Sequence, residues 1–239
     1  MRSLSHLIPQ SLSRQSSPIR VLAFVGVLAL LWLPIYGATL LLIPNSNTAS
    51  IVSMAVLFIE FLALNRWWNR VVYGRDRPWH RYGLQWSYGN LRSTLIGLIL
   101  GLLSLFLLFV VQAILGWVRW YPFSFAPVIP QFRVVLEGFL VSIGVAFGEE
   151  MVFRGWLLDE IDRDYGPRIA LWGTSVLFAG LHFIRPLAEV IRTFPQFPGL
   201  VLLGLMLVWA KRSHQNRLGI SIGLHGGLVW GYYIVTVGE

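Results

Sequence analysis

The sequence predicts an all-α fold, namely a polytopic membrane bundle of about seven transmembrane helices, with six to eight as the expected range. Hydrophobic residues make up 56% of the 239-residue chain and charged residues only 13%, a balance far too apolar for an ordinary soluble domain. The apolar residues also gather into runs that approach the roughly 20 residues of a helical membrane span. Together these observations predict an integral membrane protein.

Seven apolar segments follow one another and leave no room for a separate soluble domain. They are 21–43, 49–64, 93–118, 131–153, 169–184, 197–210 and 217–237. Two of them, 49–64 and 197–210, are short, so a tilted or partly inserted helix would accommodate them. We expect a single integral-membrane domain over 21–239, after a disordered cytoplasmic tail at 1–20 that is rich in Ser and Arg and lacks acidic residues.

The basic residues indicate the orientation of the chain and argue against nucleic acid as a partner. Fifteen of the 19 Lys and Arg lie in the N-terminal tail and in the alternate segments 64–92, 154–168 and 211–217. They sit beside apolar segments, and their alternation is the positive-inside pattern that places the N-terminus in the cytoplasm. The expected location is a bacterial plasma membrane, with an internal or organellar membrane as the alternative.

Two further patterns concern the surface and the packing of the bundle. The segment 64–92 interleaves Arg with Trp and Tyr, which suits the headgroup layer of a membrane. Glycine recurs every fourth residue in the last apolar segment, at Gly219, Gly223, Gly227 and Gly231, and more briefly at Gly97 and Gly101. A helix face without side chains lets a neighbouring helix approach closely, so we expect tight helix packing there.

Six ionisable residues fall inside the apolar segments, where an ionised group costs about 3 kcal/mol and needs a partner or a function. They are Glu60, Glu137, Glu149, Glu150, His182 and His225. Two of the acids have a cation nearby in the sequence. Glu60 lies near a span end with Arg66 beyond it, and Glu137 lies four residues after Arg133, which can neutralise it on a helix.

The adjacent acids Glu149 and Glu150 are expected to have different roles. On a helix Glu150 and Arg154 are i,i+4 neighbours, whereas Glu149 points about 100° away and has no cation nearby in the sequence. We therefore predict a buried ion pair between Glu150 and Arg154. Glu149 is predicted to face a cavity as an acid/base group.

The two histidines can reach the same depth as Glu149. The turn signal at 165–167 lies midway between Glu149 and His182, so an antiparallel hairpin would bring these two residues level. His225 lies eight residues after Arg217, which is about 12 Å into its span from the same side. All three groups can therefore converge just below the cytoplasmic surface.

A carboxylate with two imidazoles in a water-accessible pocket favours hydrolysis. The carboxylate can deprotonate water for attack on a carbonyl, and a second imidazole can stabilise the oxyanion. Alternatively, Glu149, His182 and His225 are possible ligands of a single divalent cation such as zinc. The chain has no cysteine and no His-Glu-x-x-His signature, so both metal-free and metal-dependent water activation stay open.

Three motifs in the second half of the chain resemble those of the CPBP intramembrane proteases, the family that includes type II CAAX prenyl endopeptidases and bacterial Abi proteins. They are Glu149-Glu150-x-x-x-Arg154, Phe178-x-x-x-His182, and His225 in a late span. The resemblance implies a protease-like core at 131–239, in which Glu149 and His182 activate water and His225 helps to hold the oxyanion. It assigns supporting roles to Glu150, Arg154 and Phe178.

The third motif departs from the family pattern. The family continues His-x-x-x-Asn or His-x-x-x-Asp, whereas the fourth residue after His225 is Val229. This removes an expected polar partner of the oxyanion, unless the Trp230 indole or another span supplies a donor.

The leading hypothesis is an intramembrane endopeptidase that hydrolyses membrane-associated or lipid-anchored peptides near the cytoplasmic face, with membrane lipid and the peptide substrate as its partners. A non-proteolytic membrane scaffold or regulator of the same family is the alternative, and Val229 favours it. A proton-coupled carrier that uses the same ionisable groups is the third hypothesis. It is weaker because the sequence contains no visible transporter-like repeat.

Overall fold

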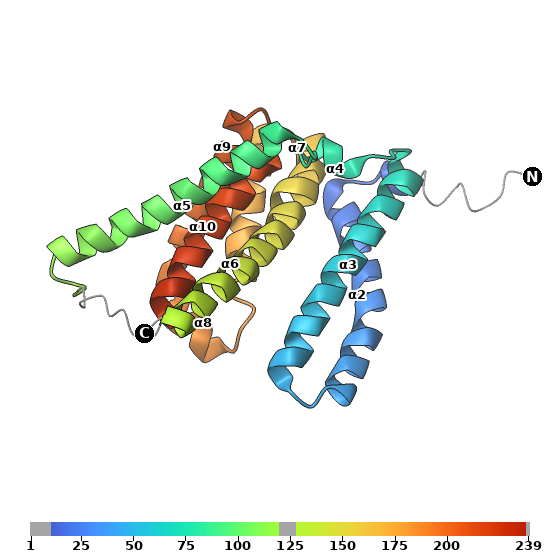
Figure 1. Cartoon of the computed structure of the whole chain (residues 1–239). Helices are drawn as coiled ribbons and strands as arrows, with labels where there is room; N and C mark the ends of the chain where they lie inside the picture. Colours follow the sequence, from blue (N-terminus) through green and yellow to red (C-terminus); the bar gives the residue numbers. More distant parts are fainter. Residues whose placement is uncertain (1–10, 120–127, 238–239) are drawn as a thin grey trace, which may run out of the picture. The chain divides into compact units, whose positions relative to one another are not determined.

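The computed structural model describes residues 11–119 and 128–237, and within these ranges every regular element is a helix (Figure 1). The prediction of an all-α fold is therefore confirmed. In chain order the elements are α2 (Ser17–Leu42), α3 (Ser46–Tyr73), α4 (Pro78–Arg81), α5 (Tyr88–Ile114), α6 (Val128–Glu150), η2 (Met151–Leu157), α7 (Leu158–Leu181), α8 (Leu187–Thr193), η3 (Phe194–Gln196), α9 (Phe197–Ser213) and α10 (Leu218–Val237).

Five helical stretches among the described residues are long and apolar enough to cross a membrane. They are Ser17–Leu42, Ser46–Tyr73, Tyr88–Ile114, Leu187–Ser213 and Leu218–Thr236. The other two predicted segments lie in α6 and α7. The short segments expected at 49–64 and 197–210 belong to longer helical stretches, and the first of the five stretches begins at Ser17, inside the segment expected as a tail. The protein is thus a polytopic helical membrane protein.

The chain divides into two compact units, which are described separately. The first unit contains the chain up to Arg81 together with Asp159–Ala170, and the second contains Tyr82–Leu158 together with the chain from Leu171 onward. Helix α7 contributes residues to both units. The expectation of a single membrane domain over 21–239 stays a prediction.

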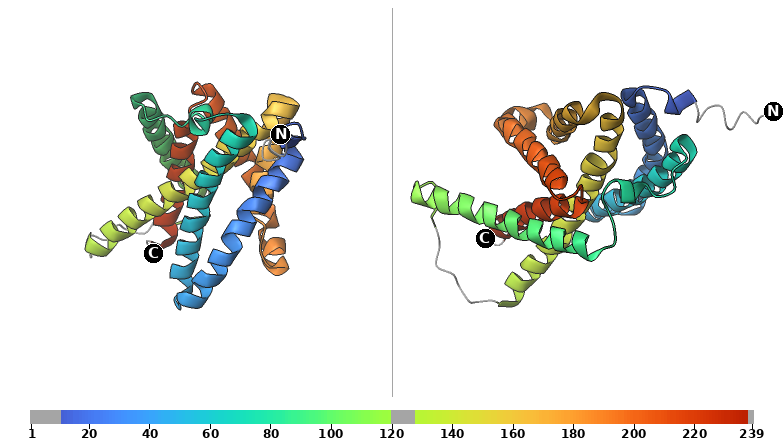
Figure 2. Two further views of the ribbon diagram at one scale, coloured as in Figure 1. Left: turned by 90° about the vertical axis from the view of Figure 1, so that its right-hand side faces the viewer. Right: turned by 90° about the horizontal axis from the view of Figure 1, so that it is seen from above.

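In the first unit, α2 and α3 lie side by side, as both views of Figure 2 show. The ring of Phe24 meets the rings of Phe61 and Trp68 edge-on, with centroids 5.9 and 5.4 Å away. Such edge-to-face pairs add about 0.5–1.5 kcal/mol each beyond the burial of their area. Three aromatic rings therefore form the apolar centre of this helix pair.

A buried polar cluster joins the start of α2 and the end of α3 to the first part of α7. The Arg20 guanidinium pairs with Glu160 and, at 3.0 Å, with Asp164, while the Tyr73 hydroxyl donates to Glu160 at 2.8 Å. Partial burial would raise the pKa of the Asp164 carboxyl, but hydrogen bonds from Arg20 and from the Ser17 backbone N–H outweigh it and lower that pKa. Ion pairs and hydrogen bonds to α7 thus hold the first residues of α2 in place.

In the second unit, glycines let α10 lie directly against α5. A Cβ atom at Gly223 would lie 1.9 Å from the Thr94 carbonyl oxygen, and one at Gly97 would lie 2.3 Å from the Ile220 carbonyl oxygen. Neither distance is compatible with a side chain, so only glycine permits this approach of the two backbones. The tight packing predicted from the glycine spacing is confirmed.

The start of α10 is capped by a side chain from another helix. The backbone N–H of Gly219 donates to Asn90 Oδ1 at 2.9 Å, and Asn90 Nδ2 donates to the carbonyls of Gly83 and Gln85. The Leu218 N–H also donates to the Gly83 carbonyl at 3.0 Å. Since the first N–H groups of a helix have no partner within it, Asn90 of α5 satisfies one of them and fixes where α10 begins.

The break predicted at 165–167 is present within α7. Gly166 has φ 77° and ψ 173°, a conformation that glycine adopts readily and other residues do not. Pro167 follows, and its fixed φ suits the first turn of the next helical stretch. A helical run therefore continues from α6 through η2 into α7 and is interrupted at Gly166.

Candidate active site

The two adjacent glutamates occupy different environments at the end of α6. The side chain of Glu150 is 0% exposed, whereas that of Glu149 is 31% exposed. Arg154 Nη1 donates to Glu150 Oε1 at 3.0 Å, so the ion pair expected from the i,i+4 spacing is present. Because an unpaired buried charge is strongly unfavourable, Glu150 and Arg154 stabilise one another in this buried pair. Glu149 is left as the carboxylate that a substrate or water can reach.

His225 of α10 lies between the two glutamates. Its Nδ1 is 3.0 Å from Glu150 Oε1, and its Nε2 is 3.8 Å from Glu149 Oε2. A carboxylate accepts hydrogen bonds, so Nδ1 carries a proton and donates it to Glu150. This contact orients the imidazole and presents Nε2 to the side of Glu149. The structure thus brings the first and third motifs together.

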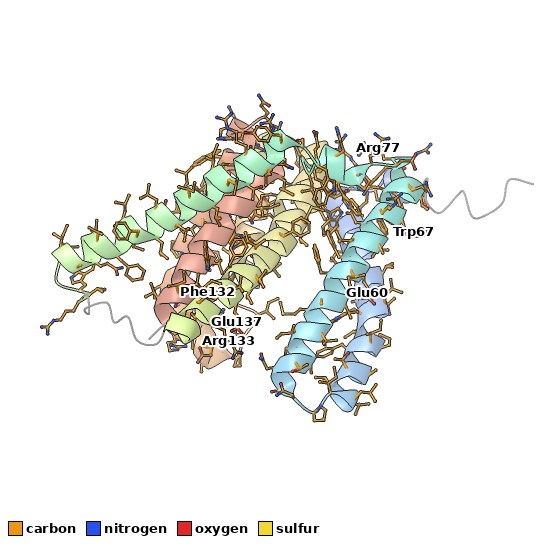
Figure 3. All side chains as sticks on the ribbon, viewed as in Figure 1. Glu60, Trp67, Arg77, Phe132, Arg133 and Glu137 are labelled. Carbon is orange, nitrogen blue, oxygen red and sulfur yellow. The ribbon has the colours of Figure 1, made fainter. Side chains whose placement is uncertain are left out.

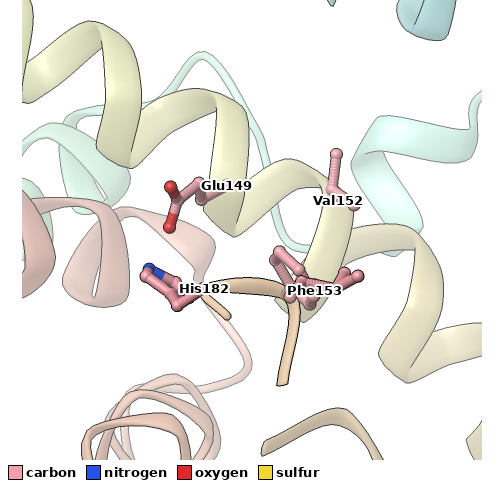
Figure 4. Close-up of a pocket in the computed structure, with 5 residues that line it drawn as sticks. Glu149, Val152, Phe153 and His182 are labelled. Atoms are coloured by element: carbon pink, nitrogen blue, oxygen red, sulfur yellow. The ribbon is translucent and has the colours of Figure 1, made fainter. Parts of the chain in front are cut away.

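The second motif meets the first at a cavity of about 360 Å³, which is lined by Glu149, Val152, Phe153, Leu181 and His182. Figure 4 shows the Glu149 carboxylate and the His182 ring facing one another. His182 follows directly on α7, and its Nδ1 lies 2.7 Å from the carbonyl oxygen of Phe178. A carbonyl only accepts, so Nδ1 is the protonated nitrogen and Nε2 is the one that can act as a base.

Phe178 is fully buried at the centre of these groups. Its ring centroid lies 5.2 Å from that of Phe153, 4.6 Å from that of His182 and 6.0 Å from that of His225. The Arg154 guanidinium carbon lies 4.2 Å from the same ring, a favourable cation–π contact. A single aromatic ring therefore sets the spacing between both histidines and the arginine.

Helix α9 contributes two contacts that the sequence interpretation missed. Arg154 Nη2 donates to the Gly204 carbonyl at 3.4 Å, and Lys211 Nζ donates to the Arg154 carbonyl at 2.6 Å. Lys211 was expected among the membrane-flanking cations of 211–217, but it belongs to α9 and is only 6% exposed. One signal was available, because Lys211 is the single lysine among 19 basic residues.

The Trp230 indole does not supply the oxyanion donor that Val229 lacks. Trp230 Nε1 donates to the Val135 carbonyl of α6 at 2.9 Å, and its ring meets Phe139 edge-on at 5.0 Å. The indole therefore joins α10 to α6. Among the residues of the three motifs, His225 Nε2 is left as the group best placed to stabilise an oxyanion.

The other two acids of the apolar segments lie outside this site, and Figure 3 labels both. Glu137 accepts from Arg133 Nε at 2.6 Å, as the i,i+4 spacing predicts. The neutralisation of Glu60 by Arg66 is not seen, because Glu60 Oε2 is buried without a hydrogen-bond partner among the described residues. Glu60 and Arg66 are six positions apart on α3, which is about 600° of helical rotation, so their side chains point to different faces of the helix.

The expected metal ligands surround one site without forming a ligand cluster. In the residues that the structure describes, no group of three or more His, Cys, Asp or Glu is arranged to hold a metal ion. Each imidazole already uses Nδ1 in a hydrogen bond, with Glu150 or with the Phe178 carbonyl. Nε2 of His182 and of His225, together with the Glu149 carboxylate, are the donors that a cation would take.

Comparison with known families agrees with the motifs. Residues 131–231 match the family described as Rce1-like, type II CAAX prenyl endopeptidase. This match extends from α6 into α10 and includes the three motifs and Lys211. No curated protein and no solved structure matches the chain. Over residues 131–231 the chain is therefore similar to the type II CAAX prenyl endopeptidase Rce1-like family, in agreement with the three motifs.

Proposed function

We propose that the protein is an intramembrane endopeptidase that hydrolyses membrane-associated or lipid-anchored peptides by water activated at Glu149 and His182. The observation that carries this proposal is the different exposure of the two glutamates. Glu150 is closed off by Arg154 and His225, whereas Glu149 shares a cavity with His182. Glu149 Oε2 is buried and has no hydrogen-bond partner among the described residues, so a water molecule bound in the cavity would give it one.

In the proposed reaction, a water molecule between Glu149 and His182 gives a proton to this pair while its oxygen attacks the scissile carbonyl carbon. The C=O electron pair moves onto the carbonyl oxygen, which becomes the oxyanion of a tetrahedral intermediate. When the C–N bond breaks, its electron pair leaves with the nitrogen. Glu149 and His182 then return the proton to the departing amine. General acid–base catalysis of this kind contributes typically 10²–10⁴-fold, and the base serves again as the acid.

His225 is the proposed oxyanion donor. With Nδ1 bonded to Glu150, a protonated imidazole would direct its Nε2–H toward the site, and the ionised Glu150 would stabilise its positive charge. The 3.8 Å between Nε2 and Glu149 Oε2 is longer than a hydrogen bond, which is common before substrate binds. Since Val229 provides no second donor, we expect slow turnover.

The cavity lining supports an apolar peptide as substrate. Apart from Glu149 and His182, its residues are Val152, Phe153 and Leu181, which offer only apolar side chains. The positive-inside distribution of Arg and Lys supports cleavage near the cytoplasmic face. Alternatively, Glu149, His182 and His225 would hold a divalent cation such as zinc, which would supply the activated water.

The test is cleavage of membrane peptides by the protein reconstituted in lipid vesicles. A library of prenylated and unmodified membrane-anchored peptides is incubated with wild type and with Glu149→Gln, and products are identified by mass spectrometry. We expect cleavage by wild type and a loss of at least about 10²-fold in the variant, with an unchanged unfolding temperature. Absence of cleavage across the whole library would contradict the proposal. Metal content and chelator sensitivity of the same sample identify the source of the activated water.

Two observations favour a second candidate function, a non-proteolytic membrane scaffold or regulator of the same family. Val229 stands where the family has Asn or Asp, and the Trp230 indole is already bonded to Val135. For a scaffold, Glu149→Gln would leave partner binding intact. Glu150→Gln would abolish it by disrupting the fold.

A further inference from the structure

The helix that carries the first motif is locally widened directly after the two glutamates. Residues Met151–Leu157 form the π-helical turn η2, with Arg154 at its centre. Here the Leu158 N–H donates to the carbonyls of Phe153 and Gly155 instead of that of Arg154, its partner in a regular α-helix. In the widened turn, the Arg154 carbonyl therefore lacks the N–H donor that a regular α-helix would supply. Arg154 is also the residue whose side chain pairs with Glu150.

Lys211 supplies a donor to that carbonyl. Its ammonium lies 2.6 Å from the Arg154 oxygen, and both residues are buried. A buried carbonyl that loses its donor is destabilising, whereas a charged donor makes one of the stronger hydrogen bonds in proteins. Lys211 therefore stabilises the widened turn in preference to the regular helix.

The chemistry of this position suits lysine, which occurs at no other position of the sequence. The other 18 basic residues are Arg, and Lys211 is the only Lys. An ammonium is a compact point charge on a flexible stem, which can approach a single carbonyl from a tightly packed helix. The planar guanidinium suits paired oxygens, as in the contacts of Arg20 with carboxylates.

The contact continues into the proposed active site through three further interactions. Arg154, held at its carbonyl by Lys211 and at its guanidinium by Gly204, donates to Glu150. Glu150 accepts from His225 Nδ1, and this contact turns Nε2 toward Glu149. A displacement of the Arg154 backbone would move Glu150 and rotate the imidazole, although Lys211 itself touches neither histidine in any described contact.

We infer that Lys211 is a positioning residue of this site: it holds the widened turn η2 so that Arg154 and Glu150 can orient the His225 imidazole. Its catalytic consequence rests on the proposed endopeptidase function, but its effect on His225 does not. Loss of the ammonium should therefore change the His225 imidazole whether or not the protein hydrolyses peptides.

The first test is independent of activity. The full-length protein is labelled with ¹⁵N and ¹³C histidine in detergent micelles, and the His225 signals are assigned with His225→Gln. We expect Lys211→Met to shift or broaden the His225 imidazole signals. The His80 signals serve as the internal reference, because His80 is exposed and belongs to the first compact unit. Unchanged His225 signals in a folded Lys211→Met protein would overturn the inference.

The matched control is Arg212→Met, which removes one cation from the neighbouring position of α9. This variant should leave the His225 signals as in wild type. An equal shift in both variants would mean that losing any positive charge on this part of α9 moves the signals, and not the loss of the contact between Lys211 and the Arg154 carbonyl. If Lys211→Met does not fold, Lys211→Gln is measured instead, because its amide can donate but has no charge.

Chemical rescue separates the ammonium from the rest of the side chain. The chain has no cysteine, so Lys211→Cys creates one reactive thiol, and alkylation with 2-bromoethylamine rebuilds a lysine-like ammonium through a thioether. We expect the aminoethylated protein to regain the wild-type His225 signals, and alkylation with 2-bromoethanol, which adds a neutral group of similar length, not to do so. Equal recovery with both reagents would overturn the role of the charge.

The second test uses the proposed reaction. Lys211→Met should lower kcat by up to about 10²-fold with little change in KM, because a displaced catalytic group affects the transition state more than substrate binding. Cleavage by wild type with an unaltered kcat in Lys211→Met would contradict the inference. Absence of cleavage by wild type would contradict the proposed function alone, and the histidine spectra would still decide the role of Lys211.

Discussion

At the scale of single residues, the site depends on how neighbouring positions on one helix face different surroundings. Glu149 and Glu150 are separated by about 100° of helical rotation, which places one carboxylate in the cavity and the other against Arg154 and His225. The same chemical group is therefore partly exposed at one position and buried in an ion pair at the next. Burial and not residue type assigns the role.

Replacing the buried glutamate should unfold the protein more readily than replacing the accessible one. Glu150→Gln leaves the Arg154 charge buried without its ion-pair partner, and we expect a loss of about 3–5 kcal/mol in the free energy of unfolding. Glu149→Gln should change it by less than about 1 kcal/mol, because Glu149 is partly exposed and its 3.8 Å contact with His225 is longer than a hydrogen bond. Denaturation of both variants in the same detergent measures the difference. Equal destabilisation would contradict the assigned roles.

Val229 offers a gain-of-function test at the residue scale. It lies one helical turn after His225 on α10, where an amide could add an oxyanion donor. An oxyanion donor is typically worth 10²–10³-fold in kcat, so Val229→Asn should accelerate peptide cleavage by about 10-fold or more. Val229→Leu, which adds no donor, is the control and should not accelerate it. A Val229→Asn protein that is folded but no faster would show that His225 acts without this partner.

At the scale of secondary-structure elements, close helix contacts and buried caps place the site. Helix α10 carries His225, and its position is fixed by the glycine contact with α5 and by the Asn90 cap at its start. Helix α9 holds Arg154 at both its carbonyl and its guanidinium. The histidine and the arginine are therefore positioned by elements that contribute no catalytic group of their own.

The glycine contact predicts a large difference between two chemically identical substitutions. Gly223→Ala would place a methyl group 1.9 Å from the Thr94 carbonyl oxygen and force α10 away from α5, at a cost of at least about 1–3 kcal/mol. Gly144→Ala on α6 meets no atom within 4 Å and should stabilise its helix by up to about 1 kcal/mol. Unfolding of the two variants in detergent compares them directly. A Gly223→Ala protein as stable as Gly144→Ala would contradict the close approach.

The contact between α2 and α7 predicts a loss of stability in acid. The pKa of the Asp164 carboxyl is lowered from its ordinary 3.8 in the folded protein. Its contribution to the free energy of unfolding is therefore complete above the unfolded-state pKa, and it is lost as the pH falls through the folded-state pKa. Thermal unfolding of wild type and Asp164→Asn should therefore differ at pH 6 and converge as the pH falls through the lowered pKa of the Asp164 carboxyl. A difference that persists at low pH would mean that Asp164 acts through packing and not through charge.

At the scale of the whole molecule, the proposed catalytic groups all belong to the second compact unit, while the polar cluster of Arg20 belongs to the first. The chain passes from one unit to the other inside α7. The same helix is interrupted at Gly166, which belongs to the first unit. The family match at 131–231 covers the part of the chain that contains the site. The first three spans lie outside that match.

The sequence by itself determined the features that depend on local geometry. Composition and segment length determined the all-α membrane fold, and helix periodicity determined the Glu150–Arg154 and Arg133–Glu137 pairs. Glycine spacing likewise indicated where helices approach closely. In each case the relevant residues lie within a few turns of one helix, so their relative positions follow from 3.6 residues per turn.

Only the tertiary structure decided which helix faces meet. The contact of His225 with Glu150 joins positions 75 apart in the chain, and that of Lys211 with Arg154 joins positions 57 apart. The π-helical turn η2 and the engagement of Trp230 by Val135 were likewise absent from the sequence interpretation. Helical periodicity places a residue on a face but does not say which neighbour that face contacts. That choice depends on close packing between helices, and it turned separate motifs into one site.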